Sequence, residues 1–566
     1  MPTIGPVILR LSQSLCFFGC AVAIAAGTAT AGAQALRPEV SAPDASVGAG
    51  ADPQVEASSE FRPNPFGMKL PAKVDPHNFS QAKHCDVLRH LKVPVTPRRL
   101  DTYMRPEFIL TRGDDSLANR DQVVSFAGRQ KLYDKGIDLY GCSSLDYLRD
   151  IKSNLSDNPV IAGPGPWHDW QLNINQVFGG DIYSRLVSKS WTGGQFHFSF
   201  TMPEAGNGGP IFSYGNTLNP DGLGTRQYHG YFYTDVGRSR DVNKSMQGLR
   251  LFEYWFQQAY GYKGQSSIRF GMINPFITFN KSIVSGLFGF WTFDEPGVIG
   301  TTPGTANGPV ITVAPPGVSW EHAANDHVVV KAMVASGYWD PTGGVDNRRG
   351  YKQYWDLNRY GLEYTYEVTY RGGTYSLNSK DNGKPWFVRA GGQYHSGIGL
   401  SNLYDVNGGY FFLTGAARQE YKGNSQYYAM FERMLYREEG SYNKGLTGFL
   451  KLKWSPWDYK GSTTKQIAPG IAYEGLFGRD HDVAFFGYSH MMVNKGVIQM
   501  SENQLVCTQL PGCSVANFQS VYELGYSARI TKFMFVNPKL YWVHYPNVRR
   551  DLGDIVSFGI ESRVSF

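Results

Sequence analysis

Alternation of apolar and polar residues with a period of two dominates the chain from about residue 166 onward. In the stretch 359–370 the even positions hold Tyr, Leu or Val, whereas the odd positions hold Arg, Gly, Glu or Thr. The stretch 195–201 repeats the pattern with Phe at every even position. Because successive side chains of a strand point to opposite faces, each such segment predicts a strand with one apolar face and one wet face.

Sixteen candidate strands can be marked by this pattern. Many of them run for about ten residues or more, the length that a tilted strand needs to cross a bilayer, whereas strands of soluble proteins average about five or six. The candidates lie around residues 182, 194, 225, 247, 266, 326, 357, 384, 408, 425, 444, 466, 480, 518, 531 and 555.

The connections between these strands differ in length, with short ones at 455–462 and 478–480 and long ones at 274–325 and 494–516. A membrane barrel has tight turns at one end and longer loops at the other. The last alternating strand ends in Phe566, and closing a barrel would remove the exposed edge of that strand. The sequence therefore predicts an all-β fold, a transmembrane antiparallel β-barrel of about sixteen strands, with eighteen as the alternative.

The N-terminal part of the chain has a different character. Arg10 precedes an apolar stretch at 15–26 and small residues up to Ala35, a pattern that predicts a secretory signal peptide over residues 1–35. Residues 36–110 begin with a stretch rich in Pro, Ala, Ser and Asp and are expected to form a flexible leader.

Between the leader and the barrel, residues 111–165 are expected to form a brace or plug with a possible first strand. Short helical patterns at 125–135 and 145–155 support this interpretation. The barrel itself is expected over residues 166–566.

Composition and charge agree with a membrane barrel and exclude one class of partner. Aromatic residues make up 14% of the chain, Gly occurs 65 times, and the mean hydropathy is −0.33. The net charge is +6, and removal of residues 1–35 takes away only the charge of Arg10. No cluster of Lys and Arg builds the basic face that a nucleic acid would need, so no nucleic acid partner is expected.

Four cysteines remain after the predicted signal peptide, namely Cys85, Cys142, Cys507 and Cys513. An even number of cysteines in an oxidising compartment favours disulfides. Cys507 and Cys513 bracket a turn-rich span, which leaves Cys85 and Cys142 as the complementary pair. A zinc site is the alternative, although no CxxC or HxxxH spacing occurs.

From about residue 124 to the end, roughly three quarters of its length, the chain resembles the carbohydrate-selective porins of the OprB type. The segments that carry the resemblance are 251–258, 268–271, 428–438, 445–449, 454–456, 472–482, 522–526, 537–540 and 558–566. The resemblance implies a sixteen-stranded barrel in the bacterial outer membrane, passive uptake of glucose and related sugars, and a constriction lined by charged and aromatic side chains. Residues 36–110 and 275–325 depart from the family pattern.

The alternation also predicts which side chains line the lumen. Phe256 and its even-numbered neighbours fit the lipid face, which places Glu253, Trp255 and Gln257 inside, with Arg269 on the next strand. These residues offer an acceptor, an aromatic surface, an amide and a guanidinium to a sugar. The other pore-lining candidates are Arg359, Glu363, Arg389 and Glu432. The simpler interpretation of any such charge is that it pairs across strands and keeps the wall hydrated.

The sequence thus predicts a porin for monosaccharides and small oligosaccharides, not an enzyme, with no cofactor and no metal. Its other expected partners are outer-membrane lipid and the barrel-assembly machinery, which would act on the C-terminal strand ending in Phe566. A general or ion-selective channel of the same fold is the first alternative. A barrel enzyme and an anchoring or adhesive barrel are the others; the stretch 487–490 begins like a nucleophile elbow but lacks the closing Gly.

Overall fold

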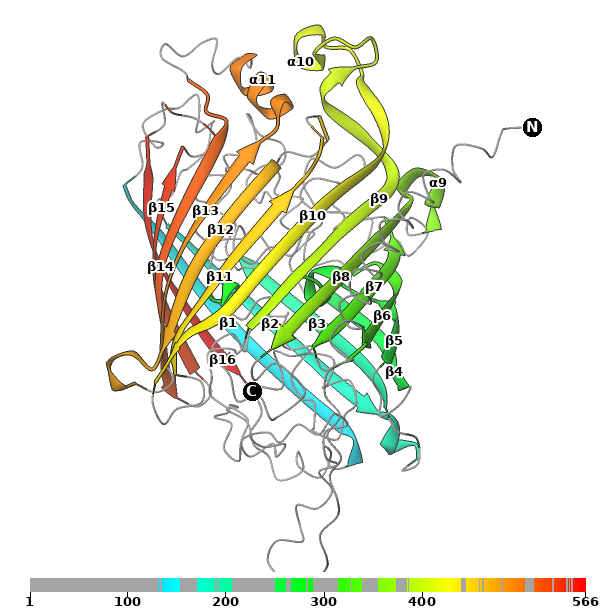
Figure 1. The fold of residues 1–566 in the computed structure, drawn as a ribbon, viewed down its shortest axis with the longest axis vertical. Coiled ribbons are helices and arrows are strands. Elements are labelled where there is room, and N and C mark those ends of the chain that lie inside the picture. Colours follow the sequence, from blue (N-terminus) through cyan, green and yellow to red (C-terminus); the bar gives the residue numbers. More distant parts are fainter. Residues whose placement is uncertain are drawn as a thin grey trace, which may run out of the picture. The chain divides into compact units, whose positions relative to one another are not determined.

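The computed structural model describes residues 132–152, 170–205, 250–288, 314–337, 355–372 and 384–565, with short gaps inside these ranges. Sixteen antiparallel strands lie in these ranges, and strands that follow one another in sequence are neighbours in the sheet (Figure 1). The strands are β1 (Ile137–Lys152), β2 (Trp170–Tyr183), β3 (Gly194–Ala205), β4 (Arg250–Tyr260), β5 (Ser266–Met272), β6 (Pro316–Ala323), β7 (Val328–Ser336), β8 (Leu362–Gly372), β9 (Trp386–Asp405), β10 (Arg418–Arg437), β11 (Gly445–Trp454), β12 (Thr463–Glu474), β13 (Val483–Val493), β14 (Phe518–Thr531), β15 (Met534–His544) and β16 (Ile555–Ser565).

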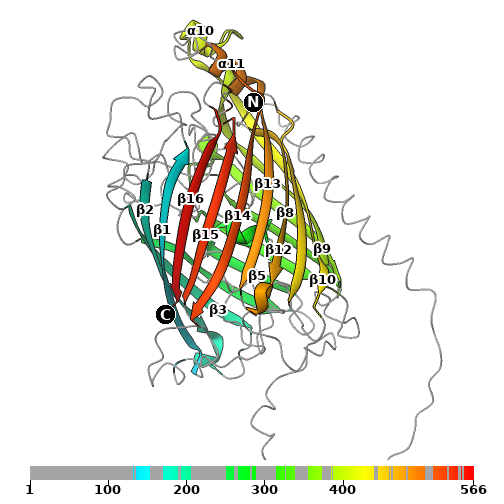
Figure 2. The same cartoon turned by 90° about the vertical axis from the view of Figure 1, so that its left-hand side faces the viewer.

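The first and last strands pair with each other, so the sheet closes. β1 runs antiparallel to β16 from the pair Cys142 and Ser565 to the pair Lys152 and Val556, and its other edge pairs with β2. Figure 2 shows β1 beside β16. Closure leaves neither strand with an exposed edge, which is how a barrel satisfies its backbone hydrogen bonds. The prediction of an all-β sheet of about sixteen antiparallel strands is confirmed.

The number of strands agrees with the sequence-based count, but some positions were wrong. The segment 145–155 was expected to be a short helix, whereas its residues up to Lys152 belong to β1. Leu145, Leu148 and Ile151 recur with the three-residue spacing of a helix, and pairing with two neighbouring strands overrides that local preference. The barrel therefore begins well before residue 166.

Three other candidate strands do not correspond to single strands among the described residues. The candidate near residue 326 is a hairpin of two strands, β6 and β7, joined at 324–327. The candidate near 408 lies in the turn between β9 and β10. The candidate near 225, the signal peptide and the leader lie outside the described residues, and of the helical pattern 125–135 only Leu132 and Lys135 are described, both in helical conformation.

The two ends of the barrel carry connections of different length. At one end, called here the long-connection end, consecutive strands are separated by residues 206–249, 273–315, 337–361 and 494–517. The opposite end has connections such as 261–265, 324–327 and 532–533. The predicted asymmetry is present, with two corrections: the short connection 455–462 lies at the long-connection end, and the expected loop 274–325 contains β6.

The longest strands rise at the long-connection end. β9 and β10 have 20 residues each, and the short helix α10 (Phe411–Thr414) lies at the tip of their hairpin (Figure 1). The helix α11 (Lys495–Asn503), from the connection between β13 and β14, lies at the same end. Among the described residues, no helix has the length and apolar character that would let it span a membrane.

Side chains divide between the two faces of the wall as the alternation predicts. Outward positions are apolar and exposed, for example Phe270 at 51% and Leu524 at 54%. Inward positions are polar and buried, for example Arg269 and Glu523. Buried charges are stable only when other groups compensate them. The inward charges of this barrel consequently need ion pairs and hydrogen bonds in its interior.

Candidate functional site

The chain that leaves β5 at the long-connection end folds into the interior of the barrel. This inner segment, described at residues 273–280 and 284–288, includes the short helices α7 (Pro275–Thr278) and η8 (Ser285–Leu287). Ile273, Phe279, Val284 and Phe288 within it are fully buried. A loop on the surface would carry no such set of buried apolar side chains, so the inner segment is packed against the wall.

Backbone N–H groups of the inner segment donate hydrogen bonds to carboxylates of the wall. Asn274 donates to Oε1 of Glu253 on β4 at 2.6 Å. Asn280 donates to Oε2 of Glu367 on β8 at 2.6 Å, and Val284 donates to Oε2 of Glu432 on β10 at 3.3 Å. The attachments follow the wall from β4 to β10. Hydrogen bonds from N–H groups to ionised carboxylates are stronger than those between neutral groups, so these contacts fix the path of the segment.

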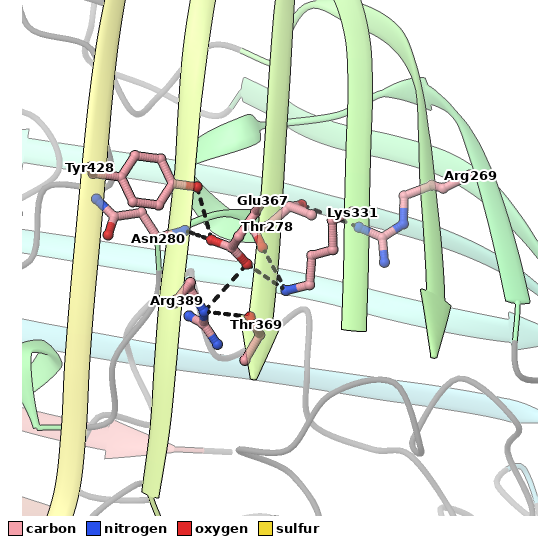
Figure 3. A network of polar contacts seen from close by, with 8 residues as sticks. All are labelled: Arg269, Thr278, Asn280, Lys331, Glu367, Thr369, Arg389 and Tyr428. Carbon is pink, nitrogen blue, oxygen red and sulfur yellow. Dashed lines mark hydrogen bonds and ion pairs between the residues drawn. The ribbon is translucent and has the colours of Figure 1, made fainter. Parts of the chain in front are cut away.

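Glu367 is the centre of the most connected of these attachments (Figure 3). Its Oε1 lies 3.4 Å from Nζ of Lys331 on β7 and 3.4 Å from Nε of Arg389 on β9. Its Oε2 accepts the Tyr428 hydroxyl from β10 at 2.9 Å in addition to the Asn280 N–H. The carboxylate therefore joins four strands and the inner segment in one network.

The two cations of this network have further partners. Lys331 donates from Nζ to the backbone oxygen of Thr278 at 3.2 Å, and Arg389 donates from Nε to Oγ1 of Thr369 at 2.9 Å. Both cations and Glu367 are at most 4% exposed. Such a group of buried charges is stable only while its members stay together, because removal of one partner leaves an uncompensated charge.

The far end of the inner segment is held by apolar contacts instead. The ring of Phe288 lies 5.6 Å from that of Phe449 on β11 and 5.0 Å from that of Phe485 on β13, measured between centroids. Glycines on the adjoining strands make room for these rings: a Cβ at Gly470 would collide with Phe449, and one at Gly525 with Phe485. The inner segment thus spans from the β4 wall to the β11–β13 wall.

A second cluster lies on β3, β4 and β5, around Trp255. The His197 ring stacks on Trp255 with centroids 4.6 Å apart, and Cζ of Arg269 lies 4.1 Å from the centroid of the indole. Arg269 also donates to Oε1 of Gln257 from Nε at 3.1 Å and from Nη2 at 2.7 Å. On the β3 side, Nδ1 of His197 lies 3.0 Å from Oδ1 of Asp181. The strands that flank β4 supply the two groups stacked on the indole, His197 from β3 and Arg269 from β5.

The structure brings most of the predicted pore-lining residues to the inner face. Glu253, Trp255, Gln257 and Arg269 lie together on β4 and β5, and Glu363, Arg389 and Glu432 lie on β8, β9 and β10. Trp255 faces inward as predicted, but it is only 2% exposed.

Arg359 lies in the short helix α9 (Leu357–Tyr360) before β8 begins, so the strand alternation that predicted it to face the lumen does not apply to it. Gly361, with φ +64°, turns the chain between the helix and the strand. The alternating sequence pattern continues upstream of the strand and gave no sign of this boundary.

Sequence reasoning missed the inner segment and the residues that meet it, above all Lys331 and Tyr428. Alternation with a period of two identifies the strands of the barrel wall. It does not indicate that a connection between two strands folds back into the interior. The one available signal was the apolar run after Asn274, with Pro275 at the start of a short helix.

The predicted disulfides stay predictions. Cys85, Cys507 and Cys513 lie outside the described residues, and Cys142 lies in β1 without a described side chain. Within the described ranges, no group of three or more His, Cys, Asp or Glu residues is arranged to hold a metal ion.

Comparison with known proteins gives both a family and a fold. The model of the family described as "Carbohydrate-selective porin, OprB family" matches residues 173–566. Among solved structures, the high pH structure of Pseudomonas putida OprB is similar with a TM-score of 0.59 and 17% identity, over 78% of this chain and 96% of that chain. The outer membrane channel DcaP of Acinetobacter baumannii has a TM-score of 0.40 and 11% identity, over 76% of this chain and 97% of that chain. No curated protein matches the chain.

Proposed function

Because the chain belongs to the carbohydrate-selective porins of the OprB family and is located in the bacterial outer membrane, we propose that it lets glucose-type sugars diffuse passively through its barrel. The family and the fold are those of channels rather than enzymes. Monosaccharides and small oligosaccharides are the solutes that the proposal assigns to it.

The observation that carries the proposal is the inner segment, which crosses an interior lined by hydrogen-bonding side chains. A sugar that passes the inner segment must exchange its hydration shell for hydrogen-bond donors and acceptors of the barrel wall. It must also bind weakly enough to leave again. Glu253, Gln257 and Arg269 offer acceptor and donor groups beside the start of the inner segment. Glu363, Arg389 and Glu432 offer such groups on the inner faces of β8, β9 and β10.

Within this proposal, Trp255 acts through Arg269. The two groups stacked on the indole, His197 and Arg269, are side chains of the protein and not a sugar. The contribution proposed for Trp255 is therefore to position the guanidinium of Arg269. The long-connection end would face the cell exterior, as the loop end of outer-membrane barrels does.

A general or ion-selective diffusion channel is the second candidate function, and two inward lysines of β11 favour it. Lys451 and Lys453 are buried on the inner face and would attract anions. This alternative predicts passage according to size and charge, whereas the sugar porin predicts a preference among neutral solutes of similar size.

Swelling of proteoliposomes separates the two candidates. Liposomes that contain the purified protein are diluted into isotonic solutions of glucose, of a disaccharide and of a linear hexitol close to glucose in mass. The sugar porin predicts faster swelling in glucose than in the hexitol. Equal rates in these two solutes would support the general channel, and no swelling in any of the three would refute the sugar porin.

A further inference from the structure

Two inward amide side chains, Asn424 on β10 and Gln393 on β9, have polar atoms that no described residue satisfies. Asn424 is 2% exposed, and neither its Nδ2 nor its Oδ1 has a hydrogen-bond partner within the described ranges. Gln393 is 5% exposed, and its Oε1 likewise has no partner there. Buried amide groups are nearly always hydrogen-bonded, so these atoms call for a partner that the described residues do not supply.

The surroundings of Gln393 fix which of its atoms is left for such a partner. Its Nε2 donates to Oε1 of Glu363 on β8 at 3.1 Å. This bond holds the amide in one orientation and leaves Oε1 as an acceptor. Glu363 thus acts as a support for the amide.

The neighbour of Asn424 across the strands cannot serve as its partner. His395 is the register partner of Asn424, but its Nε2 lies 2.8 Å from the backbone oxygen of Gly337. Its Nδ1 accepts the N–H of Gly397 at 3.2 Å. Both ring nitrogens are therefore engaged elsewhere, and the donor and the acceptor of Asn424 stay available.

The two amides lie diagonally across neighbouring strands. Gln393 pairs with Gln426, and His395 pairs with Asn424, so Asn424 is one row further along the wall than the register partner of Gln393. Diagonal neighbours of this kind have Cα atoms about 7–8 Å apart, within reach of long side chains. Together they present two acceptors and one donor to the same part of the lumen.

This pair borders the Glu367 network without belonging to it. Tyr428, two residues beyond Gln426, bonds to Glu367, and its ring covers Gly391, where a Cβ would collide with it. Gln393 and Asn424 lie nearer the long-connection end than Arg389 does. The pair is neutral, whereas the network deeper in the barrel is charged.

We propose that Gln393 and Asn424 form a binding station for a neutral polyhydroxylated solute, a hexose, ahead of the charged network. This proposal rests on the proposed sugar-porin function. Hydroxyl groups both donate and accept, so they fit an amide pair that offers both functions and carries no charge. An inorganic ion would gain little from such a pair.

The test uses the full-length protein in planar bilayers, where glucose is titrated and the half-blocking concentration is measured. Asn424→Leu and Gln393→Leu are each expected to raise that concentration about two- to tenfold, the effect of one neutral hydrogen bond, with little change in ionic conductance. Gln519→Leu on β14 is the matched control, because this inward amide is 3% exposed and, unlike Gln393 and Asn424, has no buried atom without a hydrogen-bond partner among the described residues. The control is expected to keep the wild-type value.

The possible outcomes separate the two proposals. If glucose blocks both variants as it blocks the wild type, the amides hold only water and the station is refuted while the porin function stands. If glucose does not block the wild-type current, the porin function fails and the station with it. Heat-modifiable migration in gels checks that each barrel is assembled, and Asn424→Ser replaces Asn424→Leu if the latter does not assemble.

Discussion

The backbone N–H of Asn280 donates a 2.6 Å hydrogen bond to Glu367 inside the barrel, although 87 positions separate the two residues. The bond ties the chain that follows β5 to the wall at β8. It also makes one carboxylate responsible both for holding the inner segment and for balancing Lys331 and Arg389. This double role leads to the first prediction.

Glu367→Gln should destabilise the barrel and loosen the inner segment. The change leaves Lys331 and Arg389 buried without their anion, and breaking a buried ion pair in this way costs about 3–5 kcal/mol. Denaturant unfolding of the detergent-solubilised protein measures the loss, and the variance of the open-channel current measures the mobility of the segment. Glu420→Gln, at an exposed position of β10, is the control and should change neither. Wild-type stability in Glu367→Gln would show that the network contributes little.

Phe288→Ala should release the far end of the inner segment. It removes the ring that packs on Phe449 and Phe485, a loss of about 3–5 kcal/mol for a buried Phe. We expect a larger and noisier single-channel conductance. Phe270→Ala removes the same side chain from the outward face, where Phe270 is 51% exposed, and should leave the conductance unchanged. Equal conductance in both variants would contradict the anchoring role of Phe288.

Arg269→Ala should weaken block by glucose more than it changes ionic conductance, because the guanidinium is a proposed sugar contact. Trp255→Ala should act in the same direction by loosening Arg269, and Trp255→Phe should retain most of the block because a ring still lies beneath the guanidinium. Trp454→Ala, at an outward position that is 49% exposed, is the control. Equal effects of Arg269→Ala on block and conductance would argue against a specific contact.

Much of the wall could be predicted from the sequence because every strand position has only two orientations. Alternation placed Glu253 and Gln257 inside, and both are 1% exposed. The same logic failed where local spacing imitated another structure. Leu145 and Leu148 have a helical spacing within β1, and Arg359 continues the alternation of β8 into a helix.

The contacts within the interior could not be predicted in this way. Whether Glu367 meets Lys331, Arg389 or the inner segment depends on which strands become neighbours and where the connection after β5 turns. Those are properties of the closed barrel. Trp255 illustrates the difference: its face was predictable, but its enclosure between His197 and Arg269 required the positions of both flanking strands.

Cys507 and Cys513 are predicted to form a disulfide. In that case neither should react with a maleimide reagent in the native protein, and both should react after reduction. Mass spectrometry of the labelled peptides makes the measurement. Labelling of the native protein without reduction would remove the disulfide from the account.

The central claim is that ions pass through a water-filled barrel lumen in which sugars bind weakly. Single-channel recording of the wild-type protein with increasing glucose tests this claim most directly. The account predicts discrete conductance steps that glucose reduces in a saturable manner. Steps that glucose leaves unchanged at every concentration, or the absence of steps, would contradict it.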